Sequence, residues 1–235
     1  MKIAVIPARG GSKRIPRKNI KSFAGQPMIA YAIKAAQACG LFDHVVVSTD
    51  DAEIAAIARE YGAEVPFMRP PELSDDYVAT IPVIEHAIRA CQALGWDVSH
   101  ACCIYPGVPL LQADDLRAAF ALMDEAQAPY AFTVTGFPAA VQRAMRRLPD
   151  GGMESIYPQY AATRTQDLEP AYFDAGQFYW GTVAAWFSGV SPHKSGKGLV
   201  IPESRAVDID TLQDWERAEL LYQVMQNGAA GRQAT

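Results

Sequence analysis

The sequence predicts an α/β protein with a mostly parallel sheet flanked by helices and a small excursion from its core. Three observations predict this fold. Short apolar runs, rich in β-branched residues, alternate along the chain with segments whose apolar residues recur at helical spacing. The chain has 235 residues, which suits a single sizeable core. Half of its residues are apolar, enough for strands that are buried on both faces.

A βαβ unit opens the chain. Ile3 to Ile6 is a short apolar run that stops at Pro7, as expected of a strand buried on both faces. After a polar loop, Pro27 stands at the start of a helix that ends at Gly40. The next strand is expected at Val45 to Ser48.

Strands and helices continue to alternate through the middle of the chain. The expected elements are a helix ending at Tyr61, a strand around Val65 to Phe67, a helix from about Ile81 to Leu94, a strand at Ala101 to Tyr105, a helix at Asp114 to Asp124 and a strand at Tyr130 to Val134. Such alternation predicts that most strands pair in parallel.

The pattern breaks down between Pro138 and Leu168, where turns, basic residues and aromatics predict an excursion from the core and an arm for dimer contacts. Strands are expected again at Gln177 to Trp180, Leu199 to Ile201 and Ala206 to Ile209. A last helix carries an apolar stripe from Leu212 to Met225. A single domain is therefore expected over residues 1–226, with residues 227–235 as a flexible tail.

Composition excludes several classes of partner. The net charge of -5 argues against a general binder of nucleic acid or of anionic membranes. No apolar run reaches the length of a membrane span or a signal-peptide core. The four cysteines form no CxxC pair and are expected to be buried, reduced thiols. We therefore expect a cytoplasmic protein that binds neither nucleic acid nor membrane.

A basic loop follows the first strand, where open α/β sheets place their ligands. Six of the 21 Lys and Arg residues fall within residues 9–21, although the chain is acidic overall. The loop fits neither the dinucleotide nor the Walker pattern, and a solvated basic loop is the alternative interpretation. A glycine pair that lets backbone N–H groups approach phosphate favours a small, highly charged anion. The candidate anion-binding residues are Arg9, Gly10, Gly11, Ser12 and Lys18.

Two acidic residues near the end of the chain predict a metal site. Asp208 and Asp210 alternate with apolar residues, and a period of two places both carboxylates on one side of an extended segment. Paired carboxylates suit Mg²⁺ when phosphate and water supply its other ligands. The alternative is that this segment only caps the last helix, since Thr211 and Asp214 have the spacing of a capping box.

The segment from Pro7 to Asn19 resembles the signature of the CMP-sugar synthetases, the family that contains CMP-N-acetylneuraminate synthetase, in which this loop holds CTP. The resemblance implies a Rossmann-like nucleotidyltransferase sheet. It also implies that Asp208-Ile209-Asp210 is the metal site and that Lys18 matters most to the chemistry. The nucleotide-binding residues that it implies are Ala8 against the base, Arg9, Gly10, Gly11, Ser12, Lys18, Asn19 and Thr80.

Other segments bear on the acceptor sugar. Where sialic-acid enzymes of the family carry a glutamine after the central strand, this chain reads Tyr105-Pro106-Gly107, which departs from N-acetylneuraminate enzymes. The segment Asp174 to Trp180 resembles the pseudaminic acid branch, and Arg164-Thr165-Gln166 matches an Arg-x-Gln element of the family. The sugar-binding residues implied are Tyr105, Arg164, Gln166, Asp174, Gln177 and Tyr179.

Structural roles are the alternatives for these segments. Asp76 or Thr80 would cap the third helix, and Phe178 to Trp180 would be a packed strand with alternating faces. None of the histidines, which are His44, His86, His100 and His193, falls in a motif, so no general base is visible.

The resemblance implies that the anomeric hydroxyl of pseudaminic acid attacks the α-phosphorus of CTP in line and that pyrophosphate leaves. The implied catalytic residues are Arg9, Lys18, Asp208 and Asp210, with Mg²⁺ as cofactor. A homodimer and a role in cell-surface glycan synthesis, such as flagellin glycosylation, are implied as well. The rivals are the same reaction on legionaminic, N-acetylneuraminic or ketodeoxyoctonic acid, a non-catalytic nucleotide-binding module, and a nicotinamide dehydrogenase with Asp50 on a ribose.

Overall fold

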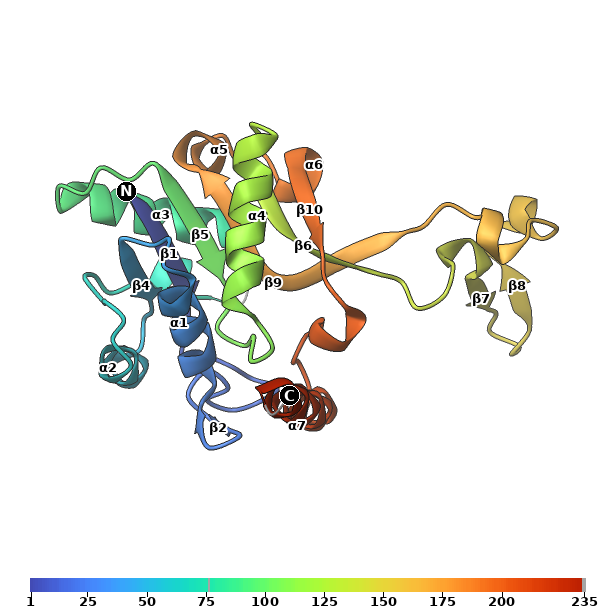
Figure 1. The fold of residues 1–235 in the computed structure, drawn as a ribbon, viewed down its shortest axis with the longest axis horizontal. Coiled ribbons are helices and arrows are strands. Elements are labelled where there is room, and N and C mark those ends of the chain that lie inside the picture. The colour runs from blue at the N-terminus through green and yellow to red at the C-terminus, as the bar shows by residue number, and fades with distance from the viewer. Residues whose placement is uncertain (76, 234–235) are drawn as a thin grey trace.

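The computed structural model describes residues 1–75 and 77–233, and a six-stranded sheet lies at the centre of these residues (Figure 1). Its strand order is β10-β6-β9-β5-β1-β4. The strands are β1 (Lys2–Pro7), β4 (His44–Ser48), β5 (His100–Ile104), β6 (Tyr130–Gly136), β9 (Tyr172–Thr182) and β10 (Gly196–Val200). Among them β9 alone runs antiparallel to its neighbours, so the mostly parallel α/β fold predicted from the sequence is confirmed.

Helices cover both faces of the sheet. They are α1 (Met28–Cys39), α2 (Ala52–Glu60), α3 (Thr80–Ala93), α4 (Ala113–Glu125), α5 (Val183–Phe187), α6 (Pro192–Ser195) and α7 (Leu212–Gln233). Helices α1 and α4 pack on one face, and α3 and α5 on the other. Strand β1, buried from Ile3 to Ile6, supplies both cores, because Ala4 and Ile6 point to the first face while Ile3 and Val5 point to the second.

A third, smaller core joins the two ends of the chain. A short hairpin of β2 (Ser22–Phe23) and β3 (Gln26–Pro27) brings Phe23 against Trp215 of α7, with ring centroids 5.3 Å apart. Ile15 of the basic loop and Ile209, which precedes α7, are buried in the same cluster. The basic loop and the segment that carries Asp208 and Asp210 are therefore held together by apolar packing.

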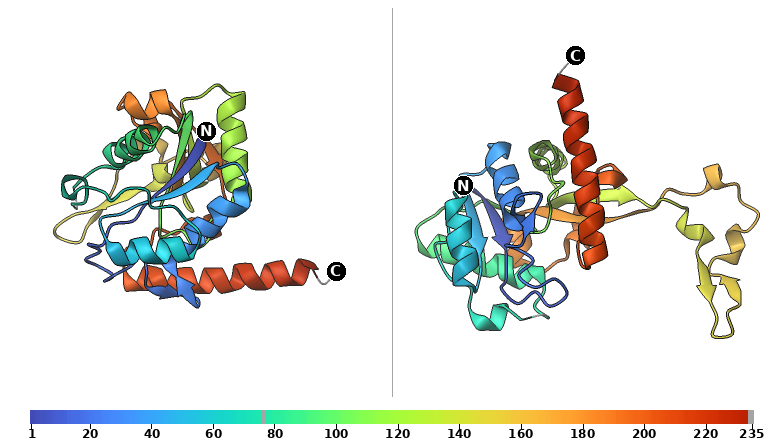
Figure 2. Two further views of the ribbon diagram at one scale, coloured as in Figure 1. Left: turned by 90° about the vertical axis from the view of Figure 1, so that its left-hand side faces the viewer. Right: turned by 90° about the horizontal axis from the view of Figure 1, so that it is seen from below.

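Some predicted elements are wrong. Residues 65–67 form no strand, and an isolated bridge between Glu64 and Val46 takes its place. Residues 206–209 form an extended loop that follows a 3-10 turn at Glu203–Arg205. Helix α7 continues to Gln233, well beyond the expected end of the helical pattern, and Figure 2 shows it running along the outside of the body and past it. Flexibility of residues 227–235 stays a prediction, and residues 234–235 lie outside the described part of the chain.

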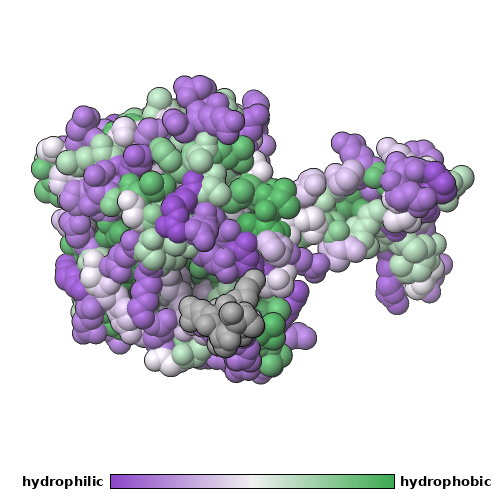
Figure 3. Space-filling view, in the orientation of Figure 1, coloured by the Kyte–Doolittle hydropathy of each residue, from purple (hydrophilic) through white to green (hydrophobic). Residues whose placement is uncertain are grey.

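The excursion predicted near residues 138–168 is an arm. Its chain leaves the sheet at the end of β6 and returns as β9, and between them lie the hairpin β7 (Met145–Arg147) and β8 (Met153–Ser155) and 3-10 turns at Val141–Arg143, Pro158–Tyr160 and Thr165–Asp167. The arm forms a lobe joined to the body by a narrow stem (Figures 1 and 3). Because β9 returns from this arm and not from a crossover helix, it enters the sheet antiparallel. Over residues 1–75 and 77–233, no helix is both long and apolar enough for a membrane span.

Candidate active site

A cleft of about 820 Å³ opens at the carboxyl ends of β1 and β5. Its walls come from the basic loop after β1, residues 69–83, the segment that follows β5, the start of β9 and the loop before α7. Open α/β sheets bind ligands at this edge. The volume falls within the range typical of small-molecule sites, which is about 300–1,000 Å³.

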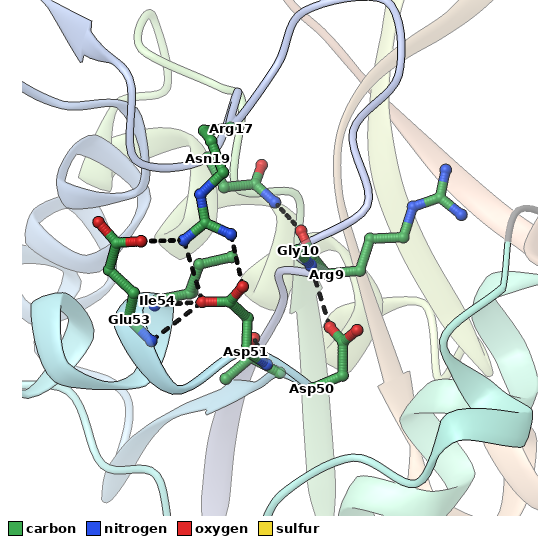
Figure 4. A network of polar contacts seen from close by, with 9 residues as sticks. Arg9, Gly10, Arg17, Asn19, Asp50, Asp51, Glu53 and Ile54 are labelled. Carbon is green, nitrogen blue, oxygen red and sulfur yellow. Dashed lines mark hydrogen bonds and ion pairs between the residues drawn. The ribbon is translucent and has the colours of Figure 1, made fainter.

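Contacts behind the cleft hold the basic loop in place (Figure 4). The Gly10 N–H donates to Asp50 Oδ1 at 3.0 Å, so this amide already has a partner inside the protein. A Cβ atom on Gly10 would lie 2.6 Å from Asp51 Oδ2, whereas a Cβ on Gly11 would meet no heavy atom within 4 Å. Gly10 therefore permits close packing of the loop on Asp51. Asp50 accepts the Gly10 N–H and does not line the cleft, which argues against the ribose ligand that a dehydrogenase would need.

Asp51 anchors this arrangement. Its Oδ1 accepts the backbone N–H groups of Glu53 and Ile54 and so caps α2. Arg17, which takes a positive φ of 56°, donates to both Asp51 oxygens at 2.5 and 3.1 Å and to Glu53 at 2.5 Å. The hydrogen bond from Arg17, aided by these backbone N–H groups, lowers the pKa of Asp51 to about 2. A charge-assisted bidentate pair thus fixes the loop behind the cleft.

Basic side chains of the loop line the cleft. The Arg9 guanidinium donates to the backbone carbonyl of Asp75 at 2.6 Å, and Asn19 Nδ2 donates to the Arg9 carbonyl at 2.9 Å. Lys18 Nζ donates to the Ile209 carbonyl at 2.6 Å. Of the nucleotide-binding residues expected from the sequence, the cleft lining includes Arg9, Ser12, Lys18, Asn19 and Thr80, whereas the buried Ala8 and the Gly10-Gly11 pair lie outside it.

Asp208 and Asp210 both line the cleft on either side of the buried Ile209. The predicted strand is absent, but the loop that replaces it still brings both acids to the cleft. Asp210 forms an ion pair with Arg14 at 2.9 Å and lies 3.7 Å from Lys18 Nζ. Loss of solvent raises the pKa of Asp208, and the charge of the neighbouring Asp210 adds to the effect. Two carboxylates that repel each other in this way favour a bound cation.

The helix cap that was the alternative to a metal site is also present. Asp214 Oδ2 accepts the Thr211 N–H at 2.7 Å, and the Asp214 N–H donates back to Thr211 Oγ1 at 3.2 Å. The hydrogen bonds from Thr211 lower the pKa of Asp214. Neither Asp208 nor Asp210 has to cap α7, so the capping and metal interpretations are compatible.

These two carboxylates fit Mg²⁺ better than a metal held by protein alone. Within residues 1–75 and 77–233 no group of three or more His, Cys, Asp or Glu side chains is placed to hold a metal ion. Mg²⁺ commonly takes one or two carboxylates and completes its coordination with phosphate oxygens and water.

Arg69 is a site residue that the sequence analysis missed. Its side chain lines the cleft, yet the residue is only 6% exposed, and its Nε and Nη2 atoms have no hydrogen-bond partner. Burial lowers the pKa of its guanidinium, which costs free energy unless a ligand compensates. No local pattern marks this residue, because Arg69 lies in a short irregular segment before Pro70 and its burial depends on tertiary packing.

The opposite wall contains part of the expected sugar site. Tyr105, Asp174 and Tyr179 all line the cleft. Thr80 Oγ1 lies 2.8 Å from the Tyr105 hydroxyl. The cap residue of α3 is Ala79, which makes no side-chain cap bond, so Thr80 does not cap that helix. Asp76, the other expected cap, lies outside the described residues.

The remaining expected sugar residues lie elsewhere in this chain. Gln177 is buried, and its Nε2 donates to the Arg205 carbonyl at 2.7 Å. Arg164 pairs with Asp167 at 2.7 Å on the arm, and Gln166 lines a second cavity of about 340 Å³ at the base of the arm. The arm projects away from the body (Figure 2), so one copy of the chain does not bring Arg164 and Gln166 to its own cleft.

Comparison with known proteins bears on what this cleft binds. The family model for cytidylyltransferases matches residues 3–160. Pseudaminic acid cytidylyltransferase of Campylobacter jejuni subsp. jejuni serotype O:2 is 42% identical over 230 residues, covering 97% of this chain and 98% of that protein. CMP-N,N'-diacetyllegionaminic acid synthase of Legionella pneumophila is 30% identical over 232 residues, covering 95% and 97%.

A solved structure of CMP:2-keto-3-deoxy-manno-octonic acid synthetase complexed with CTP superposes with a TM-score of 0.69. The superposition covers 95% of this chain and 99% of that one at 17% sequence identity, so it supports the fold alone.

Proposed function

The chain belongs to the cytidylyltransferase family, and from this premise we propose that it transfers CMP from CTP to pseudaminic acid and releases pyrophosphate. The observation that carries the proposal is the meeting of a basic loop with a pair of aspartates in one cleft. The choice of substrate is supported by the similarity to pseudaminic acid cytidylyltransferase over 97% of the chain, since the legionaminic acid synthase that matches over a comparable length is only 30% identical.

The cleft suits a triphosphate. Arg9 and Lys18 from the basic loop and Arg69 from the neighbouring wall supply positive charge for the phosphate oxygens. In the proposed reaction the anomeric hydroxyl of the sugar attacks the α-phosphorus in line and pyrophosphate leaves. Catalysis of such a step depends on positioning and on charge stabilisation, which fixed cations in a walled cleft provide.

We propose Mg²⁺ as the cofactor, held by Asp208 and Asp210. When bound, the ion neutralises charge on the phosphates and favours deprotonation of a nearby hydroxyl. Lys18 keeps the metal-binding loop in position, because its ammonium group donates to the Ile209 carbonyl between the two acids. Arg14, which pairs with Asp210 at 2.9 Å, would become available for phosphate if the ion took its place on that carboxylate.

The acceptor sugar is proposed to lie on the wall formed by Tyr105, Asp174 and Tyr179. Arg164 and Gln166 reach a sugar only from a second copy of the chain, which supports a homodimer that exchanges arms. Exposed apolar side chains on the arm are available for that contact, namely Met145, Met153, Ile156, Tyr157 and Tyr160. Light scattering tests this part of the proposal: a homodimer is expected, and Met145→Glu with Met153→Glu is expected to yield monomers.

A cytoplasmic location is proposed because the reaction consumes CTP and because all four cysteines are free thiols in the structure. Fractionation of cells that produce the protein tests this: it should be recovered with cytoplasmic markers.

Pyrophosphate release tests the proposed activity. CTP and Mg²⁺ are supplied with pseudaminic, legionaminic or N-acetylneuraminic acid, and Asp208→Ala and Lys18→Ala serve as inactive controls. Turnover with pseudaminic acid that both variants lose, and that EDTA abolishes, is expected. Turnover confined to another acid would retain the chemistry and change the acceptor. If CTP bound but no acid reacted, the protein would be a non-catalytic nucleotide-binding module.

A further inference from the structure

A set of side-chain contacts runs from the cleft to the outside of the molecule, behind the wall formed by Tyr105, Asp174 and Tyr179. At its inner end Thr80 Oγ1 lies 2.8 Å from the Tyr105 hydroxyl, and the Tyr105 ring packs edge to face on the Tyr179 ring, with centroids 5.8 Å apart. The Tyr179 hydroxyl donates to Asp174 Oδ2 at 2.5 Å. His193 Nε2 contacts the same carboxylate oxygen at 2.5 Å.

A bulge in β9 makes this chain of contacts possible. Asp174 and Tyr179 are an odd number of residues apart, so in a regular strand their side chains would point to opposite faces of the sheet. The pairing of β9 with β6 shifts between Phe132, opposite Tyr179, and Val134, opposite Asp174, so β9 has extra residues at this point. Gly176 takes a positive φ of 64° there. Bulges of this kind re-aim side chains beside active sites, and here both side chains reach the same wall.

Both oxygens of the Asp174 carboxylate accept hydrogen bonds. Oδ1 accepts the Gly176 N–H at 2.8 Å, and Oδ2 accepts from Tyr179 and His193. His193 belongs to the short helix α6, and its ring packs against Phe132 and Tyr179, with centroids 5.3 and 6.0 Å apart. The His193 side chain is 58% exposed and does not line the cleft. His193 therefore reaches the lining of the cleft through its contact with Asp174.

The carboxylate sets the direction of the hydrogen bonds. An ionised carboxylate only accepts hydrogen bonds, so the Tyr179 hydroxyl donates its single proton to Asp174. The oxygen of Tyr179 is then left with lone pairs that accept hydrogen bonds. Burial keeps this phenol protonated, because it raises the pKa of Tyr179 well above its ordinary value. The cleft wall consequently presents a hydrogen-bond acceptor at Tyr179.

We propose that His193 is a positioning residue for the acceptor sugar: it fixes Asp174, which orders the hydroxyl of Tyr179 to accept a hydrogen bond from a hydroxyl or amide N–H group of the sugar. The inference rests on the proposed function, since it concerns the acceptor side of the same cleft. CTP binds mainly through the basic loop and Arg69, so the effect is specific to the sugar.

Two variants separate the hydrogen bond of His193 from its packing. His193→Phe keeps a ring against Phe132 and Tyr179 but has no donor, whereas His193→Gln places an amide donor near the position of Nε2 and has no ring. For His193→Phe we expect the KM for the sugar to rise about tenfold, the usual order for a lost hydrogen bond to a charged group. The KM for CTP should stay within about twofold, and His193→Gln should recover most of the loss.

A double-mutant cycle with Asp174→Asn tests the route of the effect. Once Asp174 is replaced, His193→Phe should cause little further change in the KM for the sugar, because its partner carboxylate is absent. His44→Phe is the matched control, since His44 stacks on Trp96 at the far end of β4 and contacts nothing in the cleft. Thermal unfolding of each variant excludes a loss of folded protein.

The outcomes distinguish this inference from the proposed function. A wild-type enzyme that turns over pseudaminic acid, with an unchanged sugar KM in His193→Phe, would overturn the positioning role alone. Equal rises in the KM values for sugar and CTP, or rescue by Phe and not by Gln, would also overturn it. If the wild type bound CTP but turned over no acid, the proposed function would fail and the acceptor role with it.

Discussion

The Lys18 ammonium lies 3.7 Å from the Asp210 carboxylate, so the first loop and the last loop of the chain meet in one cleft. Their neighbours Ile15 and Ile209 are buried in one small core, together with Trp215 of α7. The structure thereby couples the basic loop to the aspartate pair by packing as well as by charge.

Lys18→Met should lower kcat by about 100-fold or more, because a fixed charge beside the leaving phosphates is removed from the cleft. The KM for CTP should change less than kcat, since Arg9 and Arg69 still line the site. Steady-state kinetics with pyrophosphate detection measure both constants. Lys197→Met, on an exposed position of β10, is the matched control and should retain full activity. Equal activities of the two variants would exclude Lys18 from the chemistry.

Arg69→Met should weaken CTP binding at least tenfold while leaving Tm unchanged or higher. The guanidinium is buried with Nε and Nη2 unpartnered, so without a ligand it costs folding free energy, and a methionine of similar length removes that cost. Calorimetric titration with CTP and thermal unfolding measure the two effects. A variant that loses several degrees in Tm and binds CTP normally would show that Arg69 is structural.

Gly10→Ala should destabilise the protein and weaken CTP binding, whereas Gly11→Ala should leave stability unchanged. The new Cβ at position 10 would meet Asp51 Oδ2 at 2.6 Å, and Asp51 has little room to move because it caps α2 and binds Arg17. Overpacking of this kind costs about 1–3 kcal/mol. Urea unfolding of both variants checks it, and identical midpoints would contradict the packing role assigned to Gly10.

Asp51→Asn should reduce stability at neutral pH, and the difference from the wild type should shrink in acid. The pKa of Asp51 is about 2 in the folded protein against an ordinary value of 3.8, so the folded state favours the ionised form. This stabilisation is present above about pH 4 and is lost as the pH falls towards 2. Urea unfolding at about pH 7, 5 and 3 measures it. A difference that stayed constant across these values would exclude ionisation of Asp51 as its source.

Local patterns in the sequence predicted much of the fold and several residues of the cleft. The buried strand β1 and the glycine-containing basic loop are contiguous in sequence, so their positions follow from a short stretch of residues. Asp208 and Asp210 both reach the cleft although their predicted strand does not form. The cap formed by Thr211 and Asp214 was also predictable, because it depends only on two residues three positions apart in the sequence.

Features that depend on long-range packing could not be predicted. Arg69 became a site residue through burial beneath the cleft, which no local pattern specifies. Its neighbours 65–67 have a strand-like composition but lie beyond the edge of the sheet, where only Glu64 pairs with β4. The partnership of His193 with Asp174 requires both the bulge in β9 and the return of α6 to β6. Neither is visible until the strands are assembled.

A competition experiment tests whether the enzyme prefers pseudaminic acid as the acceptor of CMP. The enzyme receives limiting CTP with Mg²⁺ and an equimolar mixture of pseudaminic, legionaminic and N-acetylneuraminic acids, and NMR identifies the CMP-sugars formed, since stereoisomers share a mass. The product ratio equals the ratio of kcat/KM values and so reports discrimination between acceptors. CMP-pseudaminic acid is expected to be the dominant product of the wild type, and Asp208→Ala is expected to form none. A dominant CMP ester of either other acid would contradict it.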